Sequence, residues 1–163
     1  MNTTQIQYPL MYQKLYKIRF ADIARRKQIW KTLVRHFFQE YIKKDDTVLD
    51  MPCGYCEFIN TVTCQKKIAI DLNPDAKQYK AKNVQFIQAS STKIPLPNNS
   101  IDKIFISNFF EHLERNDIEK TIRECHRILK KQGKVLVLQP NIRFCSKDYW
   151  MFFDHITPID DRA

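Results

Sequence analysis

The chain has 163 residues, 44% hydrophobic and 28% charged, which suits one globular domain with a single core. Its only glycines, Gly54 and Gly133, lie far apart, which excludes a P-loop or a full dinucleotide fingerprint, since both need clustered glycines. No apolar run approaches the roughly 18 residues of a membrane span, and residues 1–12 lack a signal-peptide pattern. With five cysteines and no export signal, we expect free thiols in a reducing, cytosolic compartment.

The net charge of +9 is concentrated at the beginning of the chain. Residues 1–44 carry ten Lys and Arg against two acidic residues, whereas residues 45–163 carry seventeen against sixteen. Such a basic segment could face an anionic small molecule, nucleic acid or a membrane surface, or it could be a solvated helix face. We therefore separate a basic N-terminal helical cap, 1–44, from a second domain, 45–163.

The secondary structure is predicted from hydrophobic periodicity. Residues 21–43 have apolar side chains at steps of three and four, which predicts one amphipathic helix. From residue 47 onward, β-rich runs at 47–51, 67–72, 84–89, 102–107 and 134–138 alternate with helical stretches at 56–64, 74–81 and 117–131. Asn116 is the expected cap of the last helix, and Gly133 stands where a glycine ends a helix. This alternation predicts an α/β fold with a parallel sheet and right-handed crossovers.

Two acidic residues stand at the predicted carboxyl ends of neighbouring strands, where open α/β sheets bind ligands. Asp50 ends the first strand before a turn in which Gly54 permits close approach of a ligand to the backbone. Asp71 ends the second strand, and a carboxylate there accepts two hydrogen bonds from a ribose diol. The sequence therefore predicts a site for a ribose-bearing ligand without a pyrophosphate.

Five segments resemble, in order, the motifs of class I S-adenosylmethionine-dependent methyltransferases, most closely the small-molecule, type-11 branch. The segments are V-L-D-M-P-C-G-Y-C (48–56), A-I-D-L-N (69–73), I-P-L-P-N-N-S-I-D-K-I (94–104), F-E-H-L (110–113) and R-I-L-K-K-Q-G-K-V-L-V-L (127–138). The resemblance covers about residues 46–160 and implies a Rossmann-like, mostly parallel sheet of order 3-2-1-4-5 with flanking helices. It also implies S-adenosylmethionine as methyl donor, bound by residues 45–163, and a small-molecule acceptor, for which the basic segment favours an anionic compound.

The resemblance assigns the cofactor to the strand ends, position by position. Asp50 and the turn through Gly54 would hold the methionine part of the cofactor. Asp71 would accept hydrogen bonds from the ribose hydroxyls, and Leu72 would lie against the adenine.

The resemblance also assigns residues to positions near the adenine amine and near the substrate. Ser90 and Ser91 stand where the family often has an acid near that amine. Asn108 would lie near the methionine end, and Glu111 and His112 would border the substrate.

Two histidines are candidate general bases for a hydroxyl or amine acceptor. His112 follows the fourth strand, and His155 lies in F-D-H-I-T-P (153–158). Alternatively, His112 is a half-buried, hydrogen-bonded histidine, and His155 is a lid residue paired with Asp154.

The sequence departs from the family pattern in its first turn and at its end. Pro52 and Cys56 stand in two of the three glycine places, and Pro52 fixes φ and removes a donor. The family's sheet has seven strands, so we expect the last two to be missing from a C-terminally truncated chain.

Other interpretations stay open. Cys53 and Cys56 form a C-x-x-C as in thioredoxin, but that hypothesis leaves Asp50 and Asp71 unexplained. A zinc site of Cys53, Cys56 and Cys64 lacks a convincing fourth ligand, so no metal is expected. The alternative functions are a nucleic-acid-directed methyltransferase or binder, although no nucleic-acid module is recognisable, and a non-catalytic cofactor-binding remnant.

Overall fold

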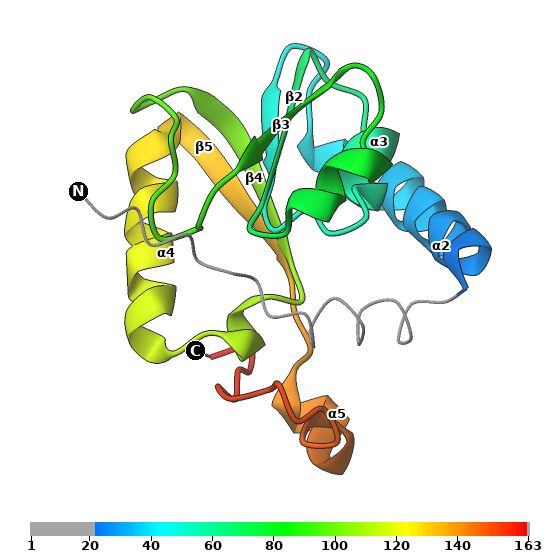
Figure 1. Cartoon of the computed structure of the whole chain (residues 1–163), viewed down its shortest axis with the longest axis vertical. Coiled ribbons are helices and arrows are strands. Elements are labelled where there is room, and N and C mark those ends of the chain that lie inside the picture. The colour runs from blue at the N-terminus through cyan, green and yellow to red at the C-terminus, as the bar shows by residue number, and fades with distance from the viewer. Residues whose placement is uncertain (1–21, 163) are drawn as a thin grey trace.

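Five strands form one sheet in the computed structural model, which describes residues 22–162 (Figure 1). Every neighbouring pair of strands is parallel, and their order is β3-β2-β1-β4-β5, which confirms the predicted order. The strands are β1 (Thr47–Asp50), β2 (Lys66–Asp71), β3 (Val84–Gln88), β4 (Ile101–Ser107) and β5 (Leu129–Leu138).

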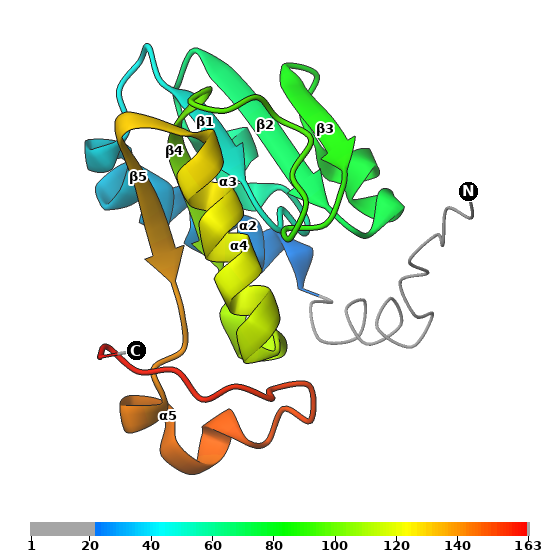
Figure 2. The ribbon, with the colours of Figure 1, turned by 90° about the vertical axis from the view of Figure 1, so that its left-hand side faces the viewer.

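Helices cover both faces of the sheet, as Figure 2 shows with α4 on one face and α2 and α3 on the other. In the central strand, Val48 belongs to the core of the α2 face and Leu49 to the core of the α4 face, and both are fully buried. Successive side chains of a strand point to opposite faces, so a strand buried on both sides consists of consecutive apolar residues.

The first face carries α2 (Ile23–His36), η1 (Phe38–Tyr41), α3 (Glu57–Thr61) and η2 (Pro74–Tyr79). The predicted single helix over 21–43 is wrong, because α2 ends at His36 and the chain leaves helical geometry at Phe37. After this break Phe38 is buried, with its ring 4.9 Å from Phe105 and 5.9 Å from Phe58. Core packing of Phe38 therefore accompanies a break that periodicity alone did not indicate.

The second face carries α4 (Arg115–Ile128), which differs at both ends from the predicted helix 117–131. Its N-cap is Glu114 rather than Asn116, and β5 follows it directly. Gly133 therefore does not end the helix. It lies in β5 at an irregularity, where Ile101 pairs with Leu129 but Lys103 pairs with Lys134. A Cβ at Gly133 would lie 2.9 Å from the Lys130 carbonyl oxygen, which is backbone, so the bulged strand favours a glycine there.

The last described segment lies beyond the carboxyl ends of the strands, as Figures 1 and 2 show. It consists of α5 (Ile142–Tyr149) and residues 150–162, which fold back onto η3 (Phe110–His112). The backbone N–H groups of Ile156 and Thr157 donate to the Glu111 carbonyl at 2.8 and 3.2 Å. This return brings residues from the end of the chain to the end of β4.

Among the described residues, no helix combines the length and the hydropathy that crossing a membrane requires. The five cysteines, all within the described part of the chain, are free thiols. The division of the chain at residue 44 stays a prediction.

Candidate functional site

The turn after β1 contains a single glycine, yet two of its residues have the positive φ that favours glycine. Gly54 has φ 49°, and Cys56, in another of the family's glycine places, has φ 58°. A left-handed conformation costs a non-glycine residue roughly 1–2 kcal/mol. Cys56 is fully buried with its Sγ 3.7 Å from the Ala76 carbonyl, so packing of its side chain offsets this cost. Cys56 thus adopts the left-handed conformation that a glycine would favour at this place in the turn.

Asp71 ties this turn to the end of β2. Its Oδ2 accepts a hydrogen bond from the Gly54 N–H at 2.9 Å, and its Oδ1 accepts one from the Asn73 N–H at 2.9 Å. An ionised carboxylate accepts about four hydrogen bonds, so Asp71 retains capacity for a ligand. Burial raises the pKa of Asp71, and the backbone donors oppose this rise.

Asp50 lies beside this turn and is almost completely buried, with 2% of its surface exposed. Its Oδ2 has no hydrogen-bond partner among the described residues. Burial raises the pKa of Asp50 well above its usual value, and the neighbouring Cys56 thiol and the Asp71 carboxylate act in the same direction. An unpartnered buried oxygen is costly, so Asp50 is an acceptor held ready for a donor.

The predicted adenine contacts have different surroundings. Leu72 is half-buried next to Asp71. Ser90 forms a local turn, with its hydroxyl 2.8 Å from Thr92 Oγ1 and accepting from the Thr92 N–H at 3.2 Å. The Ser91 hydroxyl is buried and lies 2.8 Å from Thr121 Oγ1 in α4. Both hydroxyls already have protein partners, and their role in cofactor binding stays a prediction.

Asn108 forms the junction between β4 and η3. It has φ 47°, its N–H donates to the Leu138 carbonyl at 2.8 Å, and its side chain donates to Ser107 Oγ at 3.0 Å. The residue is exposed, so the end of β4 presents a polar side chain to solvent.

Next to Asn108, the structure brings together Glu111, His112 and His155. One ligand atom from each of these three residues lies within 4.8 Å of the others, and the two imidazole rings are 5.0 Å apart. The Asp154 carbonyl lies 2.9 Å from Nδ1 of His112 and can only accept, so Nδ1 carries a proton, and in the neutral imidazole the lone pair is on Nε2. This Nε2 lies 3.7 Å from Oε1 of Glu111.

The surroundings of this cluster are buried and aromatic. Glu111 is 1% exposed, and its Oε2 accepts from Gln139 Nε2 at 2.5 Å, a role for Gln139 that sequence reasoning missed. The His155 ring stacks on Phe152 and contacts Tyr149 edge-on. His155 Nδ1 is buried without a partner among the described residues. Burial and the neighbouring His112 lower the pKa of His155.

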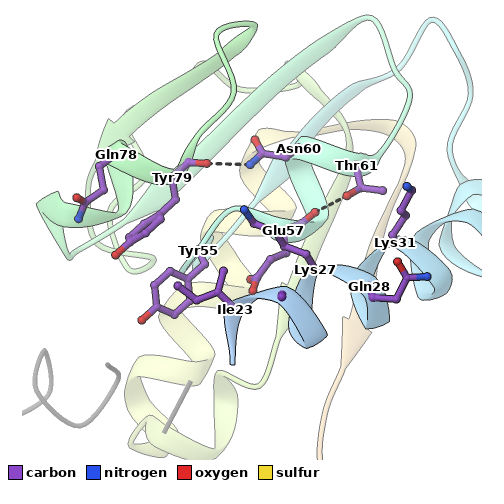
Figure 3. Close-up of a pocket in the computed structure, with 11 residues that line it drawn as sticks. Ile23, Lys27, Gln28, Lys31, Tyr55, Glu57, Asn60, Thr61, Gln78 and Tyr79 are labelled. Atoms are coloured by element: carbon purple, nitrogen blue, oxygen red, sulfur yellow. Dashed lines mark hydrogen bonds between the residues drawn. The ribbon is translucent and has the colours of Figure 1, made fainter. Parts of the chain in front are cut away.

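A separate hollow of about 590 Å³ lies between α2, α3 and η2 (Figure 3). Tyr55 and Tyr79 lie on one side, with ring centres 4.6 Å apart, and Lys27 and Lys31 project from α2. Tyr55 belongs to the turn after β1, so this hollow borders that turn. The remaining lining residues are Ile23, Ala24, Gln28, Glu57, Asn60, Thr61 and Gln78.

Comparison with known proteins identifies the family. The family model described as a methyltransferase domain matches residues 49–137, more than half of the chain. An uncharacterized protein of Methanocaldococcus jannaschii is 31% identical over 133 residues, which is 80% of this chain and 48% of that protein. The ubiquinone/menaquinone biosynthesis C-methyltransferase of Enterobacter sp. is 37% identical over 79 residues, 47% of this chain and 31% of that enzyme.

A solved structure shares the fold. The S-adenosylmethionine-dependent methyltransferase of Archaeoglobus fulgidus has a TM-score of 0.75 at 21% identity, over 93% of this chain and 69% of that one. The chain thus spans about half the length, or less, of the curated relatives that it matches. From the matched model and the Rossmann-like sheet, the chain belongs to the methyltransferase-domain family.

Proposed function

We propose that this chain binds S-adenosylmethionine and forms the cofactor-binding part of a methyltransferase that acts on a small molecule. The observation that carries this proposal is the Asp71 carboxylate, held by the Gly54 N–H at the carboxyl ends of β1 and β2. The family match and the names of the relatives support the same activity. The excess positive charge of the N-terminal segment attracts anionic compounds to the protein and so favours an anionic acceptor.

The residues present fit this cofactor. Asp71 has acceptor capacity left for a ribose diol, and Leu72 offers an apolar surface next to it. Gly54 adopts a left-handed conformation at a turn without phosphate-binding glycines, which suits a nucleoside that carries no phosphate. The unpartnered Oδ2 of Asp50 can accept from a ligand ammonium group, directly or through water. Ser90, Ser91 and Asn108 stay predicted contacts.

When bound, S-adenosylmethionine supplies an electrophilic methyl group on a sulfonium. The protein's own contribution is to hold cofactor and acceptor in line and to exclude water. We propose that the acceptor binds near Asn108 and η3, where Glu111, His112 and His155 meet. His112 and His155 are the proposed catalytic residues, because they contact each other at this edge of the sheet. We also propose that the aromatic residues 149–153 cover the bound acceptor.

Two features of the earlier predictions are kept as proposals. The basic segment 1–44, of which residues 1–21 lie outside the described residues, is proposed as a cap on the S-adenosylmethionine-binding domain 45–163. The five free thiols support a reducing, cytosolic compartment.

A nucleic-acid-directed activity is the alternative, favoured by the exposed Arg25, Lys27, Lys31 and Arg35 of α2. Retention on a polyanion with a steep salt dependence would support it.

Titration calorimetry with S-adenosylhomocysteine tests the proposal directly. We expect the wild-type chain to bind at one site. Asp71→Asn should weaken binding by about 10-fold or more, because hydrogen bonds to a charged acceptor contribute about 1.5–3 kcal/mol each. Asp75→Asn is the matched control, since Asp75 is exposed in the neighbouring η2, and its affinity should be unchanged.

The result that contradicts the proposal is a folded wild-type chain that does not bind, or an Asp71→Asn variant that binds as well as wild type. Circular dichroism and thermal melting of both variants establish that they are folded.

A further inference from the structure

We propose that Glu111, His112 and His155 form a binding site for one divalent transition-metal cation such as Zn²⁺. No metal was expected from the sequence, and neither the family match nor the relatives' names imply one. Binding of the cation itself does not depend on the proposed methyl transfer.

The spacing of the ligand atoms carries the proposal. All three lie within 4.8 Å of one another, and His112 Nε2 lies 3.7 Å from Glu111 Oε1. Two ligands bound tetrahedrally to zinc at about 2.0–2.1 Å lie about 3.4 Å from each other. Small side-chain rotations therefore bring the ligand atoms to coordination distance without moving the backbone.

The protonation and orientation of His112 suit a metal ligand. Its Nδ1–H donates to the Asp154 carbonyl at 2.9 Å, which leaves the lone pair on Nε2 facing Glu111. Metal-binding histidines are commonly held in this way, with the second ring nitrogen donating to a backbone carbonyl or a carboxylate. Gln139 orients Glu111 similarly, by donating to the other carboxylate oxygen.

Polar atoms without partners are concentrated at this cluster. Of the three buried side-chain nitrogen and oxygen atoms that lack a hydrogen bond in the described part of the chain, two belong to His155 and Gln139. The Glu111 carboxylate is 1% exposed, and its salt-bridge contact among the described residues is the His112 imidazole rather than a lysine or arginine. A buried carboxylate beside two imidazole nitrogens is stabilised by a bound cation.

The donor set indicates the kind of cation. Two imidazole nitrogens and one carboxylate oxygen suit Zn²⁺, Co²⁺ or Fe²⁺, whereas Mg²⁺ and Ca²⁺ prefer oxygen ligands. Three protein ligands leave a coordination position for water or for an oxygen of the acceptor. With the cation bound, both imidazole lone pairs are occupied, so the metal takes the place of the predicted general bases. This last step alone rests on the proposed function.

Cobalt is a suitable probe because its visible absorption reports its coordination. We expect the wild-type chain, without any nucleoside ligand, to bind one equivalent of Co²⁺ and to release it when Zn²⁺ is added. His155→Ala and Glu111→Gln should weaken binding at least 10-fold. His126→Ala, which removes an exposed histidine of α4, should bind as wild type does.

A measurement on the wild-type chain keeps the test valid if a variant does not fold. Paramagnetic Co²⁺ should broaden the imidazole NMR signals of His112 and His155 and leave those of His36 and His126 sharp. The proposal is overturned if a folded chain shows no saturable binding, or if His155→Ala and Glu111→Gln bind as tightly as wild type. A thiolate charge-transfer band, or broadening at His36 or His126 instead, also overturns it.

Discussion

The carboxylates at the two ends of the sheet differ in whether they form ion pairs with lysine. At the amino ends of the strands, Asp46 is 3.3 Å from the Lys103 ammonium, and Asp102 is 2.7 Å from that of Lys130. At the carboxyl ends, Asp50, Asp71 and Glu111 are buried, and the described residues include no lysine or arginine in ion-pair contact with them. The acidic groups at the amino ends are thus paired with lysines, whereas those at the candidate site have no lysine or arginine partner among the described residues.

The pKa shifts follow the same division. Burial raises the pKa of Asp102, but the Lys130 ammonium and the Thr47 N–H outweigh it, so the pKa is lowered overall. Asp102 therefore stabilises the fold above its unfolded pKa, and this stability is lost as pH falls through the lowered value. Burial raises the pKa of Asp50 and Asp71, so their contribution is favourable below the unfolded pKa and is lost as pH rises through the raised values. The site is kept at a cost in stability, a pattern common in binding sites.

The largest effect is expected at the amino end. Asp102→Asn should lower the free energy of unfolding at pH 7 by about 1.5–3 kcal/mol, since hydrogen bonds to charged groups contribute this much. The side chain joins two strands, because its Oδ2 accepts from the Thr47 N–H at 2.8 Å and from the Lys130 ammonium. Urea unfolding measures the change.

The matched control for this variant is Asp117→Asn. Asp117 also pairs with a lysine, Lys120, at 2.9 Å, but both side chains are more exposed and lie on one helix. Its loss should cost about 0.5 kcal/mol or less. If the two substitutions destabilised the protein equally, Asp102 would contribute no more to stability than an ordinary surface ion pair.

At the carboxyl end, the opposite sign is expected. Asp50→Asn should raise the free energy of unfolding at pH 8 by about 1 kcal/mol, because above its unfolded pKa the buried Asp50 carboxyl costs stability, and its Oδ2 has no hydrogen-bond partner among the described residues. The gain should vanish near pH 4, where the wild-type carboxyl is protonated. The same variant should bind S-adenosylhomocysteine more weakly. Urea unfolding at both pH values and calorimetry test this pair of effects, and a loss of stability at pH 8 would contradict the interpretation.

The sequence was sufficient to predict the sheet because its central strands β1, β2 and β4 are buried on both faces. Such burial requires consecutive apolar residues, such as Val48 and Leu49, and these are visible in the sequence. Asp50 and Asp71 were found for the same reason, since the end of each apolar run marks the ligand-binding edge. Local pattern therefore predicted the parallel α/β sheet, the family resemblance implied its strand order, and the roles of Asp50 and Asp71 in cofactor binding stay predictions.

Features that depend on tertiary contacts were missed. The helix break at Phe37 accompanies packing of Phe38 on Phe105, far away in sequence, and the bulge at Gly133 depends on pairing with β4. His155 lies 43 positions after His112. No spacing rule joins them, because the return of residues 150–162 onto η3 brings them together. The metal-binding proposal could arise only from the structure.

The smallest effect is expected from the lysine partner of Asp102. Lys130→Ala should lower the free energy of unfolding by about 0.2–1 kcal/mol, because the Lys130 side chain is 43% exposed and water screens the pair. The loss should shrink at high salt. Lys131→Ala, an exposed neighbour in the same strand, is the control and should leave stability nearly unchanged. An asparagine at position 102 still offers an oxygen to the Thr47 N–H, so the difference between Lys130→Ala and Asp102→Asn measures what the negative charge of Asp102 adds beyond its pairing with Lys130. If the two variants were equally destabilised, the ion pair itself would hold the amino end of the sheet.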